Sequence, residues 1–175
     1  MVLGGFFMFL LGTGNLEAQV RIGPQASYGN DADFGIGARA MIDFPTMLPG
    51  LGLIGSFDYF FPSAVDLSGF GVDISTNYWE INANLFYSFP VNTPGFEPYV
   101  GGGLNFANAS VDLTGTPVEL DDTQSEIGFN LLFGFLFPVT GLSPFVEVRI
   151  ELGGDEDFLI RGDNQVVVTG GLLFP

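Results

Sequence analysis

The chain has 175 residues, a length that fits one domain, and it contains no Cys and no His, which excludes disulfides, thiolate or imidazole metal sites and His-based acid–base catalysis. Its 20 acidic residues face only four Arg and no Lys, and this formal net charge of −16 excludes nucleic acid as a partner. Charged residues make up only 14% of the chain and hydrophobic residues 47%, yet after the N-terminus no apolar run approaches the ~20 residues of a membrane helix. A membrane β-barrel reconciles these features.

Residues 1–19 are predicted to form a signal peptide. An apolar stretch, Val2–Leu11, is followed by Gly12–Gly14 and by a small residue, Ala18, near the expected cleavage point. The basic residues that normally precede the apolar stretch are missing. The alternative is that this segment is a short apolar extension of the fold. We expect residues 20–175 to form the barrel domain.

From residue 20 onward, apolar residues recur with a period of two, which indicates strands and not helices. Clusters of Gly, Pro, Asn and Asp separate the apolar runs. Most runs have about 9–12 residues, the length that a tilted strand needs to cross a bilayer. The eight predicted strands are Val20–Tyr28, Phe34–Phe44, Leu51–Phe61, Asn77–Phe89, Pro98–Ala107, Glu126–Phe137, Pro144–Leu152 and Gln165–Phe174.

Each predicted strand has one apolar face and one mixed face. In the strand over residues 77–89, for example, Ile81 and Leu85 lie on the apolar face, and Glu80 and Asn82 lie on the other. Over all eight strands the apolar face carries no charged residue. A soluble barrel would turn that face inward. Three features favour a lipid-facing apolar side: mixed faces rich in Gly, which suit a crowded lumen, the absence of Lys, and large aromatic residues at strand ends.

The strand ends predict an up-and-down barrel with two different rims. Alternate strands close with Phe followed by Pro, which cannot extend a ladder, and the turns after them are short. We expect this rim to face the periplasm and to carry an aromatic girdle of Phe44, Phe89, Phe137 and Phe174. Longer loops are expected on the opposite, extracellular rim, over Pro62–Thr76, Asn108–Ser125 and Gly153–Asn164.

The loops of the extracellular rim, together with the short loop after the first strand, are predicted to be acidic. Their carboxylates lack the spacing of an EF-hand calcium loop, so no metal site is predicted and a solvated acidic surface is expected. Twelve of the 20 acidic residues lie in these loops: Asp31, Asp33, Asp66, Asp73, Asp112, Glu119, Asp121, Asp122, Asp155, Glu156, Asp157 and Asp163.

With eight alternating strands and an aromatic residue, Phe174, in the last one, the chain resembles the small outer-membrane β-barrel domain family, which includes OmpA-type transmembrane domains and OmpX-like proteins. The segments Pro98–Gly103 and Pro144–Arg149 add to the resemblance, which covers Val20–Pro175. It implies an all-β, eight-stranded antiparallel barrel in outer-membrane lipid, inserted by the outer-membrane assembly machinery. Pro175 after the last aromatic residue departs from the family pattern.

The mixed strand faces bring charged residues into the predicted lumen. Strand register places Arg21 near Asp43 and Arg39 near Asp58. Two interpretations follow: an internal salt-bridge network that fills a narrow interior, or, as the resemblance implies, a gate. Because acids outnumber Arg, some acids are expected at a wet rim, protonated, or holding a cation. The network comprises Arg21, Arg39, Asp43, Asp58, Glu80, Glu126, Glu147, Arg149 and Glu151.

Three functions are compatible with these features. The first is a monomeric structural or surface-interaction protein whose surface partner the sequence does not identify. The second is a narrow gated channel, and the third is a soluble ligand-binding barrel. No catalytic residue and no cofactor are predicted, because the chain lacks His and no residue pattern supports catalysis.

Overall fold

The computed structural model describes residues 19–62, 73–114, 120–153 and 164–175, and they form one closed β-barrel. Each strand pairs antiparallel with its neighbour in sequence, and β1 pairs with β8 to close the barrel. The predicted eight-stranded up-and-down fold is therefore confirmed. None of the described residues forms a helix long and apolar enough to cross a membrane. The strands are β1 (Gln19–Gly29), β2 (Asp33–Asp43), β3 (Leu51–Phe61), β4 (Asp73–Ser88), β5 (Glu97–Thr114), β6 (Leu120–Leu136), β7 (Ser143–Leu152) and β8 (Asn164–Leu173).

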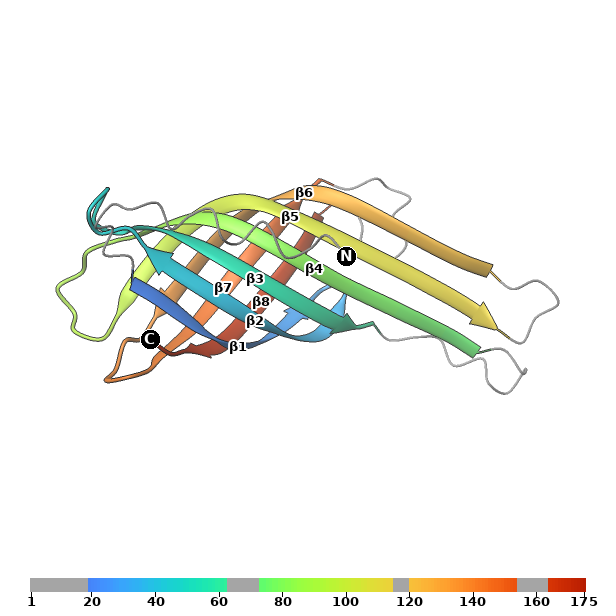
Figure 1. The fold of residues 1–175 in the computed structure, drawn as a ribbon, viewed down its shortest axis with the longest axis horizontal. Coiled ribbons are helices and arrows are strands. Elements are labelled where there is room, and N and C mark those ends of the chain that lie inside the picture. Colours follow the sequence, from blue (N-terminus) through green and yellow to red (C-terminus); the bar gives the residue numbers. More distant parts are fainter. Residues whose placement is uncertain (1–18, 63–72, 115–119, 154–163) are drawn as a thin grey trace, which may run out of the picture.

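Three central strands are longer than the sequence predicts, which corrects two of the expected loops. The pairing of β4 with β5 continues to Asp73 and Thr114, and that of β5 with β6 to Leu113 and Leu120. We call residues 73–77, 110–114 and 120–123 the β4–β6 extension; Figure 1 shows these strands projecting beyond the other five. Five acidic residues expected in loops belong to strands: Asp73, Asp112, Asp121 and Asp122 in the extension, and Asp33 as the first residue of β2.

The extension escapes sequence analysis because it lacks the large apolar outward residues that mark the other strands. On β6 the outward side chains change from Phe129 and Ile127, which are 64% and 68% exposed, to Ser125 and Thr123. On β5 the alternation itself continues, with Val111 and Leu113 between Ser110, Asp112 and Thr114, but the segment as a whole is polar enough to resemble a loop. The backbone hydrogen bonds of a strand do not depend on which side chains it carries.

Elsewhere the strand faces point as predicted. On β4, Ile81 and Leu85 are exposed on the outside, whereas Glu80 and Asn82 are buried in the lumen. Aromatic residues on β2–β5 form a band on the outer surface near the end of the apolar wall opposite the Phe-Pro rim. Trp79 lies between Phe57 and Phe106, and Phe34 is stacked on Phe61. Large apolar residues thus cover the barrel wall that faces away from the lumen, as lipid contact requires.

The even-numbered strands end at one rim, together with the C-terminus (Figure 1). One residue beyond each of these strands, a Phe N–H donates a backbone hydrogen bond to the neighbouring strand, at 2.8 Å for Phe44, Phe137 and Phe174 and 2.9 Å for Phe89. The Pro that follows each Phe has no N–H to continue the ladder. The Phe-Pro pairs therefore end the strands at a common level.

The lumen is filled by side chains in bands. Along β3 the inward residues run from Ile54 through Ser56 and Asp58 to Phe60. β4 has the same order, with Phe86 at the Phe-Pro end and Tyr78 beyond Glu80. The apolar cluster nearer the Phe-Pro rim contains Met41, Ile54, Phe86, Tyr99, Leu132, Leu136, Phe145 and Leu173, and the other contains Ala32, Phe60, Tyr78, Ala107, Ala109 and Val167.

Candidate functional site

Six charged side chains meet in the middle of the lumen, and we call them the lumen charge cluster: Arg39, Asp58, Glu80, Glu147, Arg149 and Glu151. They come from β2, β3, β4 and β7, and none is more than 3% exposed. Taking a charge out of water is costly unless partners compensate it. The cluster is therefore stable only through the contacts its members make with one another and with neutral donors.

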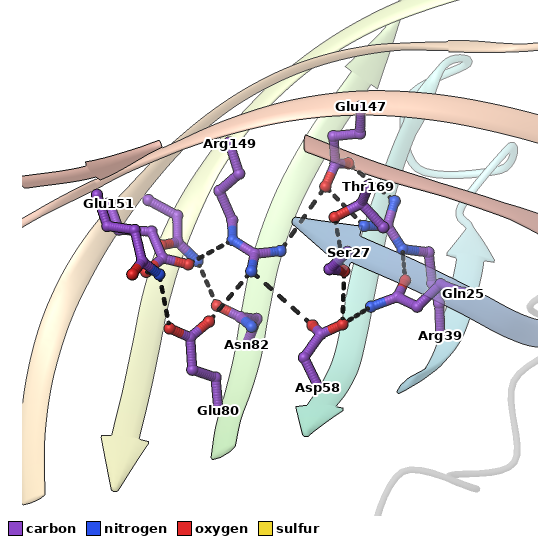
Figure 2. A network of polar contacts seen from close by, with 12 residues as sticks. Gln25, Ser27, Arg39, Asp58, Glu80, Asn82, Glu147, Arg149, Glu151 and Thr169 are labelled. Carbon is purple, nitrogen blue, oxygen red and sulfur yellow. Dashed lines mark hydrogen bonds and ion pairs between the residues drawn. The ribbon is translucent and has the colours of Figure 1, made fainter. Parts of the chain in front are cut away.

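Arg149 is the centre of the cluster. Its Nε donates to Glu151 Oε1 at 2.7 Å, and its Nη2 donates to Glu80 Oε2 at 3.2 Å. Asp58 Oδ2 lies 3.8 Å from Nη2, and Glu147 Oε1 lies 3.9 Å from Nη1. Figure 2 shows the guanidinium reaching across the lumen from β7 towards β3 and β4. One cation therefore serves four carboxyl groups on three strands.

Arg39 forms the second ion pair, and its partner differs from the expected one. Its Nη1 and Nη2 donate to the two oxygens of Glu147 at 2.9 and 2.6 Å, a two-pronged geometry that suits a guanidinium. Its Nε donates to Gln25 Oε1 at 2.8 Å, and Gln25 Nε2 donates to Asp58 at 2.7 Å. Gln25 thus links Arg39 to Asp58, where the sequence predicts direct proximity. The Phe145 ring also lies 4.3 Å from the Arg39 guanidinium carbon.

Neutral side chains complete the cluster, and sequence analysis does not identify them. Ser27 Oγ donates to Asp58 at 2.8 Å, and Tyr99 donates its hydroxyl to Glu147 at 2.9 Å. Gln165 Nε2 donates to Glu80 at 3.2 Å and to Glu151 at 3.1 Å. Tyr78 donates its hydroxyl to Glu80. Only the three-dimensional closure of the barrel brings these residues together; the strand pattern signals merely that they face inward.

A small residue makes room for one of these donors. Gly134 pairs with Tyr99 across β5 and β6, and a Cβ at Gly134 would overlap the Tyr99 ring. The ring can therefore lie flat over β6, with its hydroxyl in contact with Glu147. This arrangement gives a physical reason for a glycine on the inward face of a strand, where glycine otherwise weakens the ladder.

Three residues of the predicted network lie outside the lumen charge cluster. Arg21 and Asp43 form an ion pair of 2.7 Å, with side chains 16% and 24% exposed, close to the Phe-Pro rim. They line an open cavity of about 620 Å³ together with Glu97, Tyr87 and Phe89. Glu126 faces inward on β6, half-buried, opposite Ala107. In the part of the chain that the structure describes, no three acidic residues are grouped so that they could hold a metal ion.

Comparison with known families identifies the chain. The outer membrane protein β-barrel domain family matches residues 10–155, and the chain belongs to that family. Membership places this barrel among bacterial outer-membrane proteins, with lipid around it. No curated protein matches the sequence.

Solved structures with the same fold share little sequence with this chain. Neisserial surface protein A has 18% identity and a TM-score of 0.65, over 90% of this chain and 97% of that one. The N-terminal β-barrel domain of Pseudomonas aeruginosa OprF has 14% identity and a TM-score of 0.61, over 90% and 96%. The attachment invasion locus protein Ail of Yersinia pestis has 13% identity and a TM-score of 0.55, also over 90% and 96%. At these identities the likeness concerns the fold alone.

Proposed function

We propose that this chain is a closed outer-membrane barrel with a structural or surface-interaction role, and neither a channel nor an enzyme. The observation that carries the proposal is the filled lumen. Eight strands enclose an interior just wide enough for side chains. Here an apolar cluster around Phe86 and Tyr99, the lumen charge cluster, and the residues Phe60 and Tyr78 follow one another along the strands.

An ion that crossed this lumen would meet two kinds of barrier. It would have to part the aromatic side chains of the apolar cluster near the Phe-Pro rim. It would also have to break ion pairs whose members are held on separate strands. Removing one partner from a buried ion pair strands the other charge, at a cost of about 3–5 kcal/mol. Both barriers favour a closed barrel.

Conductance in planar bilayers tests the proposal. The purified full chain, reconstituted at neutral pH, is expected to give no stepwise conductance. Its insertion would be verified in the same preparation by protease protection of the barrel strands. Well-defined conductance steps from inserted wild-type barrels would overturn the proposal of a closed lumen.

The orientation follows from the two rims. Family barrels have short periplasmic turns and longer extracellular connections. We therefore place the Phe-Pro rim, with its girdle of Phe44, Phe89, Phe137 and Phe174, in the periplasm and the β4–β6 extension outside the cell. In this proposal residues 1–19 are a cleaved signal peptide. Residues 1–18 lie outside the described residues, and Gln19, which pairs with Asp43 as the first residue of β1, would leave with them, so that the mature strand begins at Val20. The assembly machinery inserts the chain, which works as a monomer.

The scarcity of Arg and Lys limits the kinds of surface partner that this chain can bind. Ail has been solved with sucrose octasulfate, a heparin analogue. Sulfates are bound by Arg and Lys, but this chain has no Lys. Of its four Arg, the three in the described residues, Arg21, Arg39 and Arg149, lie in the lumen or at the Phe-Pro rim, and Arg161 lies outside the described residues. A neutral or cationic surface partner fits this barrel better than a polyanion. Binding of the outer surface to heparin beads at physiological salt would contradict this inference.

A gated channel is the second candidate, and one observation favours it. Glu147 contacts both arginines, Arg39 at 2.6 Å and Arg149 at 3.9 Å. Partners within the cluster could exchange without leaving a charge unpaired. If the cluster is a gate, Arg149→Met should open conductance steps that Val148→Ala, on the lipid side of the same strand, does not. Silence of both variants would exclude the gate.

A further inference from the structure

The lumen charge cluster contains more acid than base. Among the described residues it holds four carboxyl groups and two guanidinium groups, all buried. With every group ionised, the cluster would carry an excess of two negative charges in a space that solvent does not reach. Uncompensated charge in such a place is expensive, so the excess must be reduced by a bound positive species.

The carboxyl groups differ in whether they share their donors. Glu147 receives two N–H groups from Arg39 and the hydroxyl of Tyr99, and this set of donors fits a carboxylate. Asp58 accepts at one oxygen from Gln25 and Ser27. Glu80 accepts from the Tyr78 hydroxyl, but it shares the Arg149 guanidinium and the two N–H groups of one amide, Gln165, with Glu151.

The same two carboxyl groups lie side by side: Gln165 Nε2 is 3.2 Å from Glu80 Oε1 and 3.1 Å from Glu151 Oε2, and Arg149 donates to both groups. Two ionised carboxylates held this close repel each other, whereas a carboxylic acid and a carboxylate can share one proton. Around Glu80 the other titratable or charged groups are Tyr78 on β4, Asp58 on β3, Arg149 on β7 and the half-buried Glu126 on β6; β5 presents only Ala107. Acids thus surround the pair with Arg149 as the sole cation in contact with Glu80 among the described residues.

We propose that Glu80 and Glu151 form a proton-binding site, in which one proton shared between the two carboxyl groups belongs to the folded barrel at neutral pH. The proton supplies the positive charge that the cluster lacks and allows one guanidinium to serve both groups. This site is independent of whether the barrel conducts, so the conductance experiment and the test below can fail separately.

Substitution by Gln separates a protonated acid from an ionised one. Gln has the shape of a protonated Glu, so Glu80→Gln or Glu151→Gln should leave the unfolding equilibrium constant at pH 7 within about tenfold of wild type. Glu147→Gln is the matched control in the same cluster, and loss of its charge opposite Arg39 should raise that constant by about 100-fold or more. If both pair variants are as damaging as the control, both carboxyls are ionised and the proposal is wrong.

The pH dependence of barrel stability shows whether a proton is bound in the folded state and released on unfolding. A group that keeps a proton in the folded state and releases it on unfolding makes the barrel less stable as pH rises. Between pH 6 and 9, the unfolding constant of wild type should therefore rise more steeply than that of Glu80→Gln, by up to tenfold per pH unit for one proton. Parallel curves for the two proteins would overturn the proposal.

Infrared spectroscopy tests the proposal on the wild-type barrel, so the result does not depend on whether a variant folds. At pH 7 the carbonyl stretch of a protonated carboxylic acid should be present in detergent-folded protein and should shift in deuterated water. Its absence would exclude the proton. A bound cation is the competing species: if Na⁺ or K⁺ at constant ionic strength stabilises wild type and not Glu80→Gln, the site holds a metal ion and not a proton.

Discussion

At the scale of single residues, the barrel interior resembles a protein core in which charge replaces part of the apolar packing. Arg39 and Arg149 are enclosed, and each forms an ion pair with a carboxyl group on another strand. Gln25 connects the two ion-pair centres, because it contacts both Arg39 and Asp58, and Asp58 lies beside Arg149 (Figure 2). Gln165 bridges Glu80 and Glu151, the two carboxyl groups nearest to Arg149. In such networks the loss of one member affects all the others, because the remaining polar groups stay buried.

Replacing Arg149 with Met should strongly destabilise the barrel. The substitution leaves Glu80, Glu151 and Asp58 without the cation that contacts all three. We expect a loss of about 3–5 kcal/mol in the free energy of unfolding at neutral pH, measured in detergent with denaturant. At acidic pH the stranded carboxyls can take up protons, so the loss should be smaller.

The control for this prediction lies on the same strand. Val148 points to the lipid side and is half exposed, so Val148→Ala should cost little and should show no dependence on pH. If Arg149→Met were equally mild at both pH values, the guanidinium would be solvated, in conflict with its complete burial.

At the scale of elements, one sheet serves two environments. The parts of β4, β5 and β6 nearer the Phe-Pro rim enclose the lumen and carry apolar residues on their outer face. The β4–β6 extension instead carries polar outward residues such as Thr123. We expect the strand to leave the lipid at the change from Ile127 to Ser125 on β6. The barrel wall and the extension are thus continuous in hydrogen bonding but differ in the polarity of their outward residues.

The extension should be dispensable for folding. Ala109 and Gln124 are directly opposite in the ladder, so residues 110–123 can be replaced by Asn-Gly, which forms a tight hairpin turn. The shortened chain should insert and unfold with a midpoint close to that of wild type, because the lumen charge cluster is untouched. Loss of folding would show that the extension contributes to barrel assembly; loss of a surface interaction alone would support its proposed extracellular role.

A charged residue on the outer surface should be tolerated on the β4–β6 extension but not on the apolar part of the barrel wall. Ala83 faces outward near the middle of β4, and Ala83→Arg should lower the free energy of unfolding in lipid by roughly 2–4 kcal/mol. Thr123→Arg, outward on the extension, should change it little. Equal effects of the two substitutions in vesicle unfolding experiments would place the lipid boundary elsewhere.

At the scale of the whole molecule, closure of the ladder is the property that stabilises the barrel. Every strand has two neighbours, so no free edge runs the length of the described sheet. In lipid, where no water can satisfy backbone groups, a closed barrel is one of only two possible spanning structures. Closure also explains why the interior can hold charges that no exposed sheet would bury.

Closure leads to a prediction for the intact protein. The full chain should remain in the membrane fraction under urea extraction, and its apparent size on gels should change on boiling, because an unboiled barrel stays folded in detergent. A chain that is extracted by urea and migrates identically with and without boiling would instead support a soluble barrel, the third function considered from the sequence.

Sequence alone determined the number of strands, their order and the face that each residue of the eight predicted runs occupies. These properties follow from local periodicity: Ile81 and Glu80 had to lie on opposite sides of a strand, whatever the rest of the fold. The Phe-Pro pairs also marked the strand ends at one rim, because Pro cannot donate to a ladder. The Arg21–Asp43 ion pair could also be predicted from the sequence, because the register of the single hairpin formed by β1 and β2 brings the two residues close together.

The tertiary structure decided what the charges do. Arg39 pairs with Glu147, and Arg149 with Glu80, across a lumen that exists only when β1 meets β8. The tilt and stagger of a closed barrel set which inward residues share a level, and neither is encoded by a single strand. The length of the β4–β6 extension was likewise decided in three dimensions, because a ladder continues through backbone hydrogen bonds where the apolar outward residues have ended.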